Sequence, residues 1–293
     1  MNKALLCGIA AFVMWGLFPP YFKTITGSAL EVLAYRVVFA SFFSFVFIKA
    51  TRRTKNLERV ISDRQTFYRL SLAGFFVTLN WGIFIYAVTH EQILAASIGQ
   101  LINPLFFMLL GAIFLKEKLS QTVKFAIFLV FIAIIIEVVA YGSLPIISIS
   151  LPAVFAIYGL IKKRVHAPAL EGLFVETLWL VPFFLIYIFF IEIKGVGNFG
   201  FDLNGAFLIG AGFTTFLPLI AFSVATNELK LTTIGFLQYI TPSMTIFFGI
   251  FIYHEPINLI RIISFVIIWV AVVITTLDSV KGYKKDRDEI SDI

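Results

Sequence analysis

Two segments of the sequence repeat the same polar residues and prolines at the same spacing. Gln100 lies four residues before Pro104, as Gln238 lies four residues before Pro242. Each proline is followed by Gly after seven residues and by Glu after a further six, so the whole pattern recurs with an offset of 138. A proline inside a helix removes the hydrogen bond to the carbonyl four residues earlier, which here belongs to the two glutamines. The matched amides predict a solute site at these two helix kinks, and a plain kink for helix packing is the alternative.

Aromatic and amide side chains in other segments are candidates for the walls of the same cavity. Asn80 and Trp81 are adjacent in an apolar segment and offer an amide and an aromatic face to a small amphipathic ligand. Trp15 and Tyr158 are repeat-matched aromatics that lie deeper than an interfacial belt. Tight helix packing is the alternative to cavity lining. The predicted substrate-binding set is Gln100, Asn103, Gln238, Tyr239, Asn80, Trp81, Trp15, Tyr158 and Arg36.

Two charged residues fall inside apolar segments at repeat-equivalent positions. Arg36 and Glu176 are separated by 140 residues and have opposite sign. A charge inside a membrane faces a partner or a wet cavity, so Arg36 either binds an anionic group or forms a structural ion pair with Glu137. Glu176 is the candidate proton-coupling carboxylate, because an enclosed carboxyl can bind and release a proton in the working pH range. A neutral, hydrogen-bonded Glu176 that joins helices is the alternative.

The composition specifies the kind of element that must position these side chains. Of the 293 residues, 60% are hydrophobic and only 14% are charged, whereas soluble domains have about 45–50% and about 25%. The apolar residues come in blocks close to the roughly 20 residues that a helix needs to cross a bilayer. The chain is therefore predicted to be an all-α membrane protein. The ten predicted spans are 4–22, 30–49, 69–88, 94–115, 122–140, 144–162, 169–191, 203–224, 231–252 and 260–277.

Basic residues predict the orientation of these spans. With the N-terminus in the cytoplasm, all of them fall on the inner side except Lys23, Lys194, Arg261 and the intramembrane Arg36. The positive-inside rule then places both termini in the cytoplasm. The same bias explains the net charge of +6 without a nucleic-acid partner, and the basic joint at 49–69 is interpreted as a topology signal that faces anionic lipid.

The polar pattern belongs to a longer internal repeat. Ala29-Leu30-Glu31 opens the second span as Ala169-Leu170-Glu171 opens the seventh, with an offset of 140, and Gly74 with Thr78 matches Gly210 with Thr214. Because each half holds five predicted spans, the second half must enter the membrane in the opposite orientation. We expect two inverted five-helix repeats, at 1–141 and 142–280, followed by a cytoplasmic tail at 281–293. Such repeats are typical of carriers with a site near the midplane.

The sequence resembles the drug/metabolite transporter superfamily, specifically the EamA-type permeases of the RarD group. The resemblance covers about residues 3–280. It rests on Trp15-Gly16 with Pro20-Tyr21-Phe22-Lys23, Glu31 with Arg36, Asn80-Trp81, Ile102-Asn103-Pro104-Leu105 leading to Glu117, and Gly235-Phe236-Leu237-Gln238-Tyr239 leading to Pro242 and Glu255. It implies a multi-pass carrier of the inner (cytoplasmic) membrane that moves small organic solutes, usually outward, by alternating access. Gln100 departs from the group, in which an aromatic is expected.

We therefore expect a secondary transporter, an exporter of metabolites, amino acids or drug-like compounds, with protons as a candidate coupling ion. Its expected partners are a small-molecule substrate and the lipid bilayer. No cofactor is expected, because no nucleotide-binding loop is present. An intramembrane enzyme is the less favoured class: His90, His166 and His254 lie in joints and one cysteine, Cys7, builds no metal site. A receptor or scaffold is the other alternative. Substrate identity and oligomeric state are left open.

Overall fold

The computed structural model describes residues 3–22, 24–89, 93–142, 146–252 and, within 259–274, all residues except 261, 265 and 272. The described residues form helices and include no strand. The helices are α1 Lys3–Gly16, α2 Phe18–Phe22, α3 Ala29–Ala50, α4 Thr54–Ser62, α5 Arg64–Thr89, α6 Ile93–Phe114, α7 Gln121–Tyr141, α8 Ile146–Lys163, α9 Ala169–Leu178, α10 Val181–Ile193, α11 Leu203–Glu228, α12 Leu231–Leu237 and α13 Ile240–Phe251. The described residues of 259–274 are also helical.

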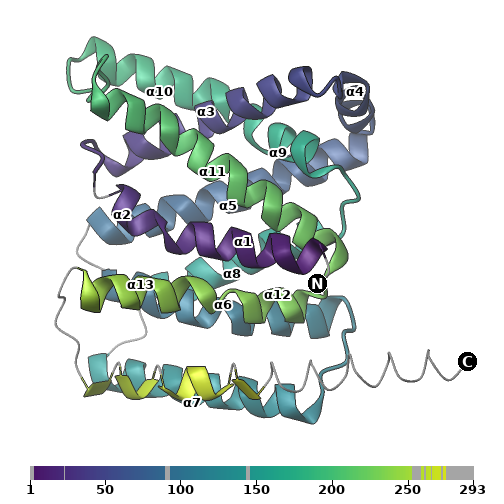
Figure 1. The fold of residues 1–293 in the computed structure, drawn as a ribbon, viewed down its shortest axis with the longest axis vertical. Helices are drawn as coiled ribbons and strands as arrows, with labels where there is room; N and C mark the ends of the chain where they lie inside the picture. Colours follow the sequence, from purple (N-terminus) through teal and green to yellow (C-terminus); the bar gives the residue numbers. More distant parts are fainter. Residues whose placement is uncertain are drawn as a thin grey trace, which may run out of the picture.

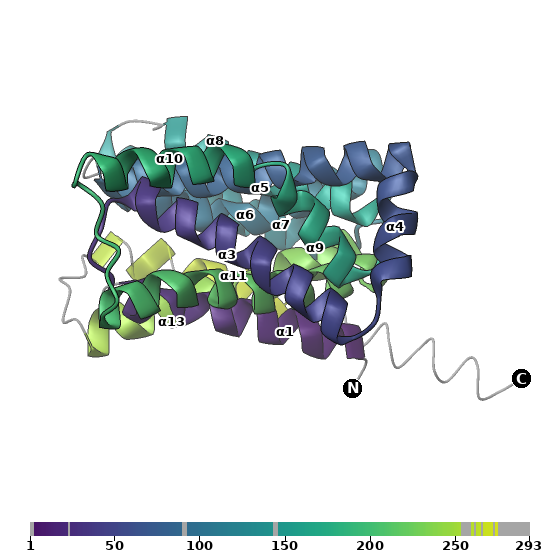
Figure 2. The same cartoon turned by 90° about the horizontal axis from the view of Figure 1, so that it is seen from above.

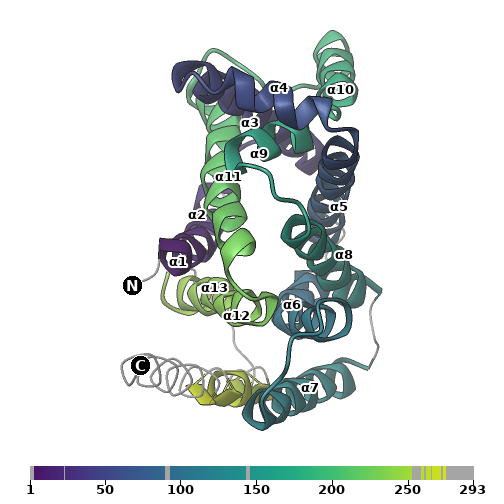
Figure 3. The ribbon, with the colours of Figure 1, turned by 90° about the vertical axis from the view of Figure 1, so that its right-hand side faces the viewer.

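The long helices run side by side across one stack (Figure 1), with α10 and α3 at one edge and α7 at the other. Helix α4 stands across the ends of the others (Figure 2), and we call this end of the stack the α4 end. Seen end-on (Figure 3), α11, α1 and α2 lie on one side, α5 and α8 on the other, and α6 with α12 and α13 separates them from α7. The start of α1 also lies at the α4 end (Figure 1).

Among the described residues, three helices are long and apolar enough to cross a membrane by length and composition: Ala29–Ala50, Gln121–Ala140 and Leu203–Glu228. The pair α9 and α10 makes a fourth if the bent pair counts as one span. The all-helical membrane class is thus confirmed for the described residues. The number of ten spans, the inversion of the halves and the cytoplasmic termini stay predictions.

Prolines explain where the predicted spans are interrupted. The span expected at 169–191 bends by 52° between α9 and α10, because Pro182 cannot donate a hydrogen bond to the carbonyl of Leu178. The span expected at 4–22 is interrupted at Leu17, just before Pro19 and Pro20. The sequence analysis placed single continuous helices at both positions, and this detail was wrong because it weighed apolar length above the prolines.

The basic joint at 49–69 was expected to be a short connection, and it contains α4 instead. Leu57 and Val60 are buried against the ends of neighbouring helices, whereas Lys55 and Arg59 are exposed. This alternation is the pattern of an amphipathic surface helix. The exposed basic face is compatible with the expected contact with anionic lipid.

Capping side chains define the starts of the long helices. Ser28 accepts a hydrogen bond from the backbone of Glu31, and Glu31 accepts one from the backbone of Ser28, which together make a capping box. Ser120 caps α7 and Asp202 caps α11 in the simpler way. Each such cap contributes about 1 kcal/mol to stability.

Glycine allows α5 to approach the broken end of α9. A Cβ atom added to Gly74 would overlap the backbone carbonyl oxygen of Glu176, while one added to Gly82 on the same helix would meet no atom within 4 Å. The contact lets α5 pack against α9 at the point where α9 is about to bend. The two glycines are therefore a matched pair for a test of this packing.

We expect Gly74→Ala to lower the free energy of unfolding by about 1–3 kcal/mol, the usual effect of overpacking. Gly82→Ala should be neutral or stabilise by up to about 1 kcal/mol, because alanine favours helix. Thermal unfolding of both purified variants in detergent measures the difference. Equal stability of the two variants would show that the close contact of α5 with α9 is not a packing constraint.

Candidate functional site

Arg36 is buried between three helices and stacks on an aromatic ring. Its side chain projects from α3, and the residue is 8% exposed. The guanidinium carbon lies 4.7 Å from the ring centre of Trp81 on α5 and 5.7 Å from that of Phe18 on α2. Its Nε donates a hydrogen bond of 2.9 Å to the hydroxyl of Thr215 on α11. Polar and aromatic side chains from both predicted halves therefore surround the Arg36 charge.

The expected pairing of Arg36 with Glu137 is not decided, because the side chain of Glu137 lies outside the described residues. Trp81 is half-buried and contacts Arg36, so two of the predicted site residues come together. Asn80, its neighbour, donates a hydrogen bond of 2.8 Å to the carbonyl of Leu151 on α8. In this state Asn80 ties α5 to α8.

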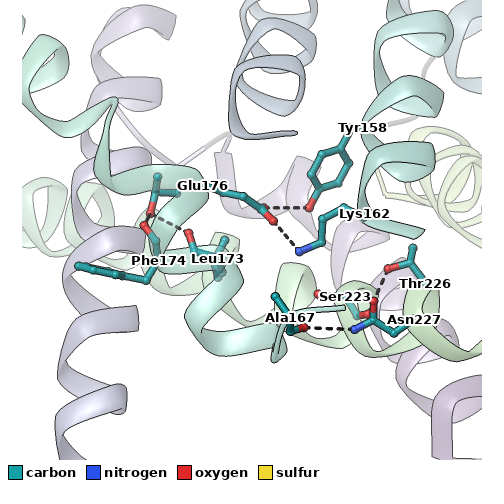
Figure 4. Close-up of polar contacts among 10 residues, drawn as sticks. Tyr158, Lys162, Ala167, Leu173, Phe174, Glu176, Ser223, Thr226 and Asn227 are labelled. Carbon is teal, nitrogen blue, oxygen red and sulfur yellow. Dashed lines mark hydrogen bonds and ion pairs between the residues drawn. The ribbon is translucent and has the colours of Figure 1, made fainter. Parts of the chain in front are cut away.

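Glu176 forms a buried ion pair that the sequence analysis missed (Figure 4). Its carboxylate contacts the ammonium group of Lys162 and accepts a hydrogen bond of 3.2 Å from the hydroxyl of Tyr158. The three residues are between 0% and 3% exposed. In the sequence Lys162 is grouped with the basic residues of a predicted cytoplasmic joint, because Lys163 and Arg164 follow it. In the structure it lies inside α8 and compensates the charge on α9.

The repeat-matched aromatics Trp15 and Tyr158 join one aromatic cluster. Both rings contact the rings of Phe155 and Phe222, with centroids 5.4–5.9 Å apart. Trp15 on α1 is half-buried, and Tyr158 on α8 is completely buried. The cluster fills the space between α1, α8 and α11, so these aromatics pack helices together in this state. Their role as cavity walls stays a prediction.

The two proline segments face each other but are not equivalent in shape. Helix α6 continues through Pro104, whereas Pro242 follows a break at Gln238 and Tyr239 that separates α12 from α13. Gly235 on α12 approaches the carbonyl of Pro104, since a Cβ there would lie 3.0 Å from that oxygen. The structure thus brings the helices of the two segments into direct contact.

Amide groups in these segments are buried and not fully satisfied. Gln238 is 4% exposed, and its side-chain nitrogen has no hydrogen-bond partner. The side-chain oxygen of Asn103 on α6 is also buried without a partner, and Gln100 is half-buried. A buried polar atom without a hydrogen-bond partner is costly. The binding of a solute at these atoms stays a prediction.

Tyr239 does not join the other predicted site residues. It is 4% exposed and packs with Met108, Val130 and Ala271 between α6, α7 and the 259–274 helix. Its hydroxyl is buried without a hydrogen-bond partner. Because Arg36, Trp81 and Glu176 lie on the other side of α6 and α12, Tyr239 is the predicted residue that the structure separates from them.

Three carboxylates tie segments of the two predicted halves together. Glu117, after α6, accepts a hydrogen bond of 2.8 Å from the backbone of Leu231 and so caps α12. Glu31 accepts hydrogen bonds of 2.6 and 2.8 Å from the backbone and side chain of Asn198. Glu171 lies 3.6 Å from Arg53. In the sequence these glutamates mark the internal repeat, and Glu31 and Glu117 also mark the family resemblance. Their apolar surroundings could have signalled a need for partners.

Among the described residues no group of three His, Cys, Asp or Glu side chains could hold a metal ion. His166 is exposed, and His90 and His254 lie outside the described residues. A chain of apolar helices with paired charges buried between them is a multi-pass membrane protein.

Comparison with known proteins identifies the class more closely. A profile of the EamA-like transporter family matches residues 2–139 and again residues 143–277. "Protein RarD" of Salmonella typhi is 35% identical, with 97% of this chain and 98% of the relative covered. An "Uncharacterized transporter" of Vibrio cholerae serotype O1 is 38% identical, covering 96% and 94%, and "Uncharacterized transporter YojE" of Bacillus subtilis is 36% identical, covering 98% and 97%.

The fold is also found in a solved structure. One crystal structure matches with a TM-score of 0.70 at 13% identity, covering 94% of this chain and 96% of that one. The chain is therefore a membrane transporter of the drug/metabolite transporter type. It belongs to the EamA-like transporter family, in the RarD group.

We expect the Lys162 and Glu176 charges to depend on each other. Glu176→Gln or Lys162→Met alone leaves one buried charge uncompensated and should destabilise the protein by about 3–5 kcal/mol. The double variant should recover most of this loss, because it removes both charges. Thermal unfolding of the four proteins gives the coupling energy. Additive losses in the double variant would mean that the two side chains do not interact in the membrane.

Proposed function

We propose that the protein is a secondary transporter of the cytoplasmic membrane that exports small organic metabolites, amino acids or drug-like compounds by alternating access. The observation that carries this proposal is the contact between the two proline segments, where the side-chain oxygen of Asn103 and the side-chain nitrogen of Gln238 are buried without hydrogen-bond partners. Relatives named as transporters cover nearly the whole chain and support the same class.

We also propose that residues 1–141 and 142–280 are the two halves of the carrier and that they insert in opposite orientations. The two separate family matches, at 2–139 and 143–277, support this division. Contacts between equivalent elements support it as well: α3 packs along α9 and α10, which begin and continue the equivalent segment of the second half. In such a carrier the substrate site lies where the halves meet.

The proposed substrate site consists of Gln100, Asn103 and Gln238 at the α6 and α12 contact, with Arg36 on α3 and Trp81 and Asn80 on α5. Trp15 and Tyr158 complete the proposed set, and Pro104 and Pro242 provide the local backbone irregularity. Arg36 would favour substrates with an anionic group, because its charge is stacked on Trp81 and not surrounded by bulk water.

We also propose that Glu176 couples transport to protons, on a condition that follows from its ion pair with Lys162. While Lys162 contacts the carboxylate, it compensates the Glu176 charge inside the protein. We expect protonation of Glu176 to accompany the separation of Lys162 from the carboxylate. In this respect Glu176 acts as a coupling group only if α8 and α9 separate during transport.

The test is uptake and counterflow in proteoliposomes with a pool of labelled amino acids and small metabolites, with and without a pH gradient. Saturable counterflow of any member supports transport, and accumulation that collapses with the gradient supports proton coupling. The double variant Glu176→Gln with Lys162→Met then tests Glu176. Absence of counterflow across the pool, with correctly inserted protein, contradicts the proposed substrate classes.

We expect Gln100→Ala and Gln238→Ala to lower the rate of counterflow about tenfold, the effect of one lost hydrogen bond worth about 1.4 kcal/mol. Insertion should be intact, because alanine favours helix. Gln121→Ala, at an exposed position in the first turn of α7, is the matched control. Rates equal to the wild type in both variants would remove these glutamines from the site.

A further inference from the structure

Glu171 is a buried carboxylate with no hydrogen bond. It lies in the first turn of α9 at the α4 end and is 0% exposed. Both of its carboxylate oxygens are buried without a hydrogen-bond partner. Its ion-pair partner is Arg53, whose Nε lies 3.6 Å away and whose side chain is 44% exposed. The carboxylate is thus enclosed, whereas the positive charge beside it already reaches water.

The equivalent position in the first half shows what a structural glutamate looks like here. Glu31 lies in the first turn of α3 and is 1% exposed, much like Glu171. It accepts hydrogen bonds from the backbone of Ser28 and from both the backbone and the side chain of Asn198. At this repeat position, the carboxylate of the first half is therefore hydrogen-bonded by neutral donors. The carboxylate of the second half has a single half-exposed charge beside it.

The other charged groups around the start of α9 do not compensate Glu171. The elements packed against α9 include α3, α4, α5 and α11. Their remaining charged side chains near this end are exposed: Lys49, Lys55, Glu58, Arg59, Arg64, Arg69 and Glu228. Lys162 on α8 is buried but is paired with Glu176. Among the described residues, Arg53 is the cation within 4 Å of Glu171.

The physical consequence is a link between the position of Arg53 and the protonation of Glu171. An ionised carboxylate that is buried without hydrogen bonds is strongly unfavourable once its counter-charge leaves. If Arg53 moves into water, the carboxylate must either follow it or take a proton. Conversely, transfer of a proton from hydronium to the carboxylate gives a neutral carboxylic acid and water, and it removes the attraction that holds Arg53.

We propose that Glu171 is a proton-binding site whose occupancy releases Arg53 and loosens the α4 end of the protein. This inference rests on the proposed function and names a binding site for its coupling ion. Arg53 directly precedes α4 in the first half, and Glu171 begins α9 in the second half, so their contact joins the two halves. Glu171 differs from Glu176 because its counter-ion is already half-exposed, whereas Lys162 is buried with its carboxylate.

Infrared titration of the purified full-length protein in lipid nanodiscs tests the site without any substrate. The wild type should show a protonated-carboxyl band that grows as the pH falls. Glu171→Gln should lack the part of this band that Glu171 contributes, since the other carboxylic acids also protonate as the pH falls, and the repeat-equivalent control Glu31→Gln should keep that part. Arg53→Gln, which preserves Glu171, should enlarge that part at a fixed pH, because the carboxylate then has no counter-charge. A band of wild-type size in Glu171→Gln or in Arg53→Gln overturns the proposal.

The transport assay separates this inference from the proposed function. Proton-driven accumulation should be lost in Glu171→Gln while counterflow without a gradient persists at more than half of the wild-type rate. Accumulation that persists in Glu171→Gln would overturn the coupling role, even with the infrared band lost. If the wild type transports no compound of the pool, the proposed function fails, and the infrared titration still decides whether Glu171 binds a proton.

Discussion

The structure depends on one constraint: a polar group enclosed among apolar helices must find its partner within the protein. In hydrocarbon each unsatisfied group costs several kcal/mol. Lys162 and Tyr158 meet this need for Glu176, and Thr215 and Trp81 do so for Arg36. These contacts join neighbouring helices, because each partner comes from another helix than the charged residue. They connect α8 with α9 and α3 with α5 and α11.

The same constraint makes the exceptions informative. Among the buried atoms without hydrogen-bond partners are the side-chain oxygen of Asn103, the side-chain nitrogen of Gln238 and both carboxylate oxygens of Glu171. The first two lie at the contact of the proline segments, where we propose the substrate site, and Glu171 lies at the α4 end. Equivalent positions in the two halves also differ, since Glu31 is fully hydrogen-bonded and Glu171 is not.

The class of fold followed from the sequence, because apolar block length and charge distribution are properties of single segments. The repeat equivalence of Gln100 with Gln238, and of Glu31 with Glu171, could be recognised from the sequence for the same reason. The partner of Glu176 was not, since Lys162 belongs to a basic run that resembles a topology signal. The bend between α9 and α10 was missed because the apolar run outweighed Pro182. Tyr239 was grouped with Gln238 by adjacency, although neighbouring residues in a broken helix face different helices.

Alternating access by two halves is tested most directly by locking each end in turn. In a Cys7→Ser background, one lock joins Glu31→Cys to Asn198→Cys and the other joins Arg53→Cys to Glu171→Cys, each with a thiol cross-linker. A cysteine at the half-buried Asn80 is then treated with an impermeant thiol reagent from each side of the membrane. Each lock is predicted to leave Asn80→Cys reactive only from the side opposite the lock. Reactivity from the same side under both locks would contradict alternating access.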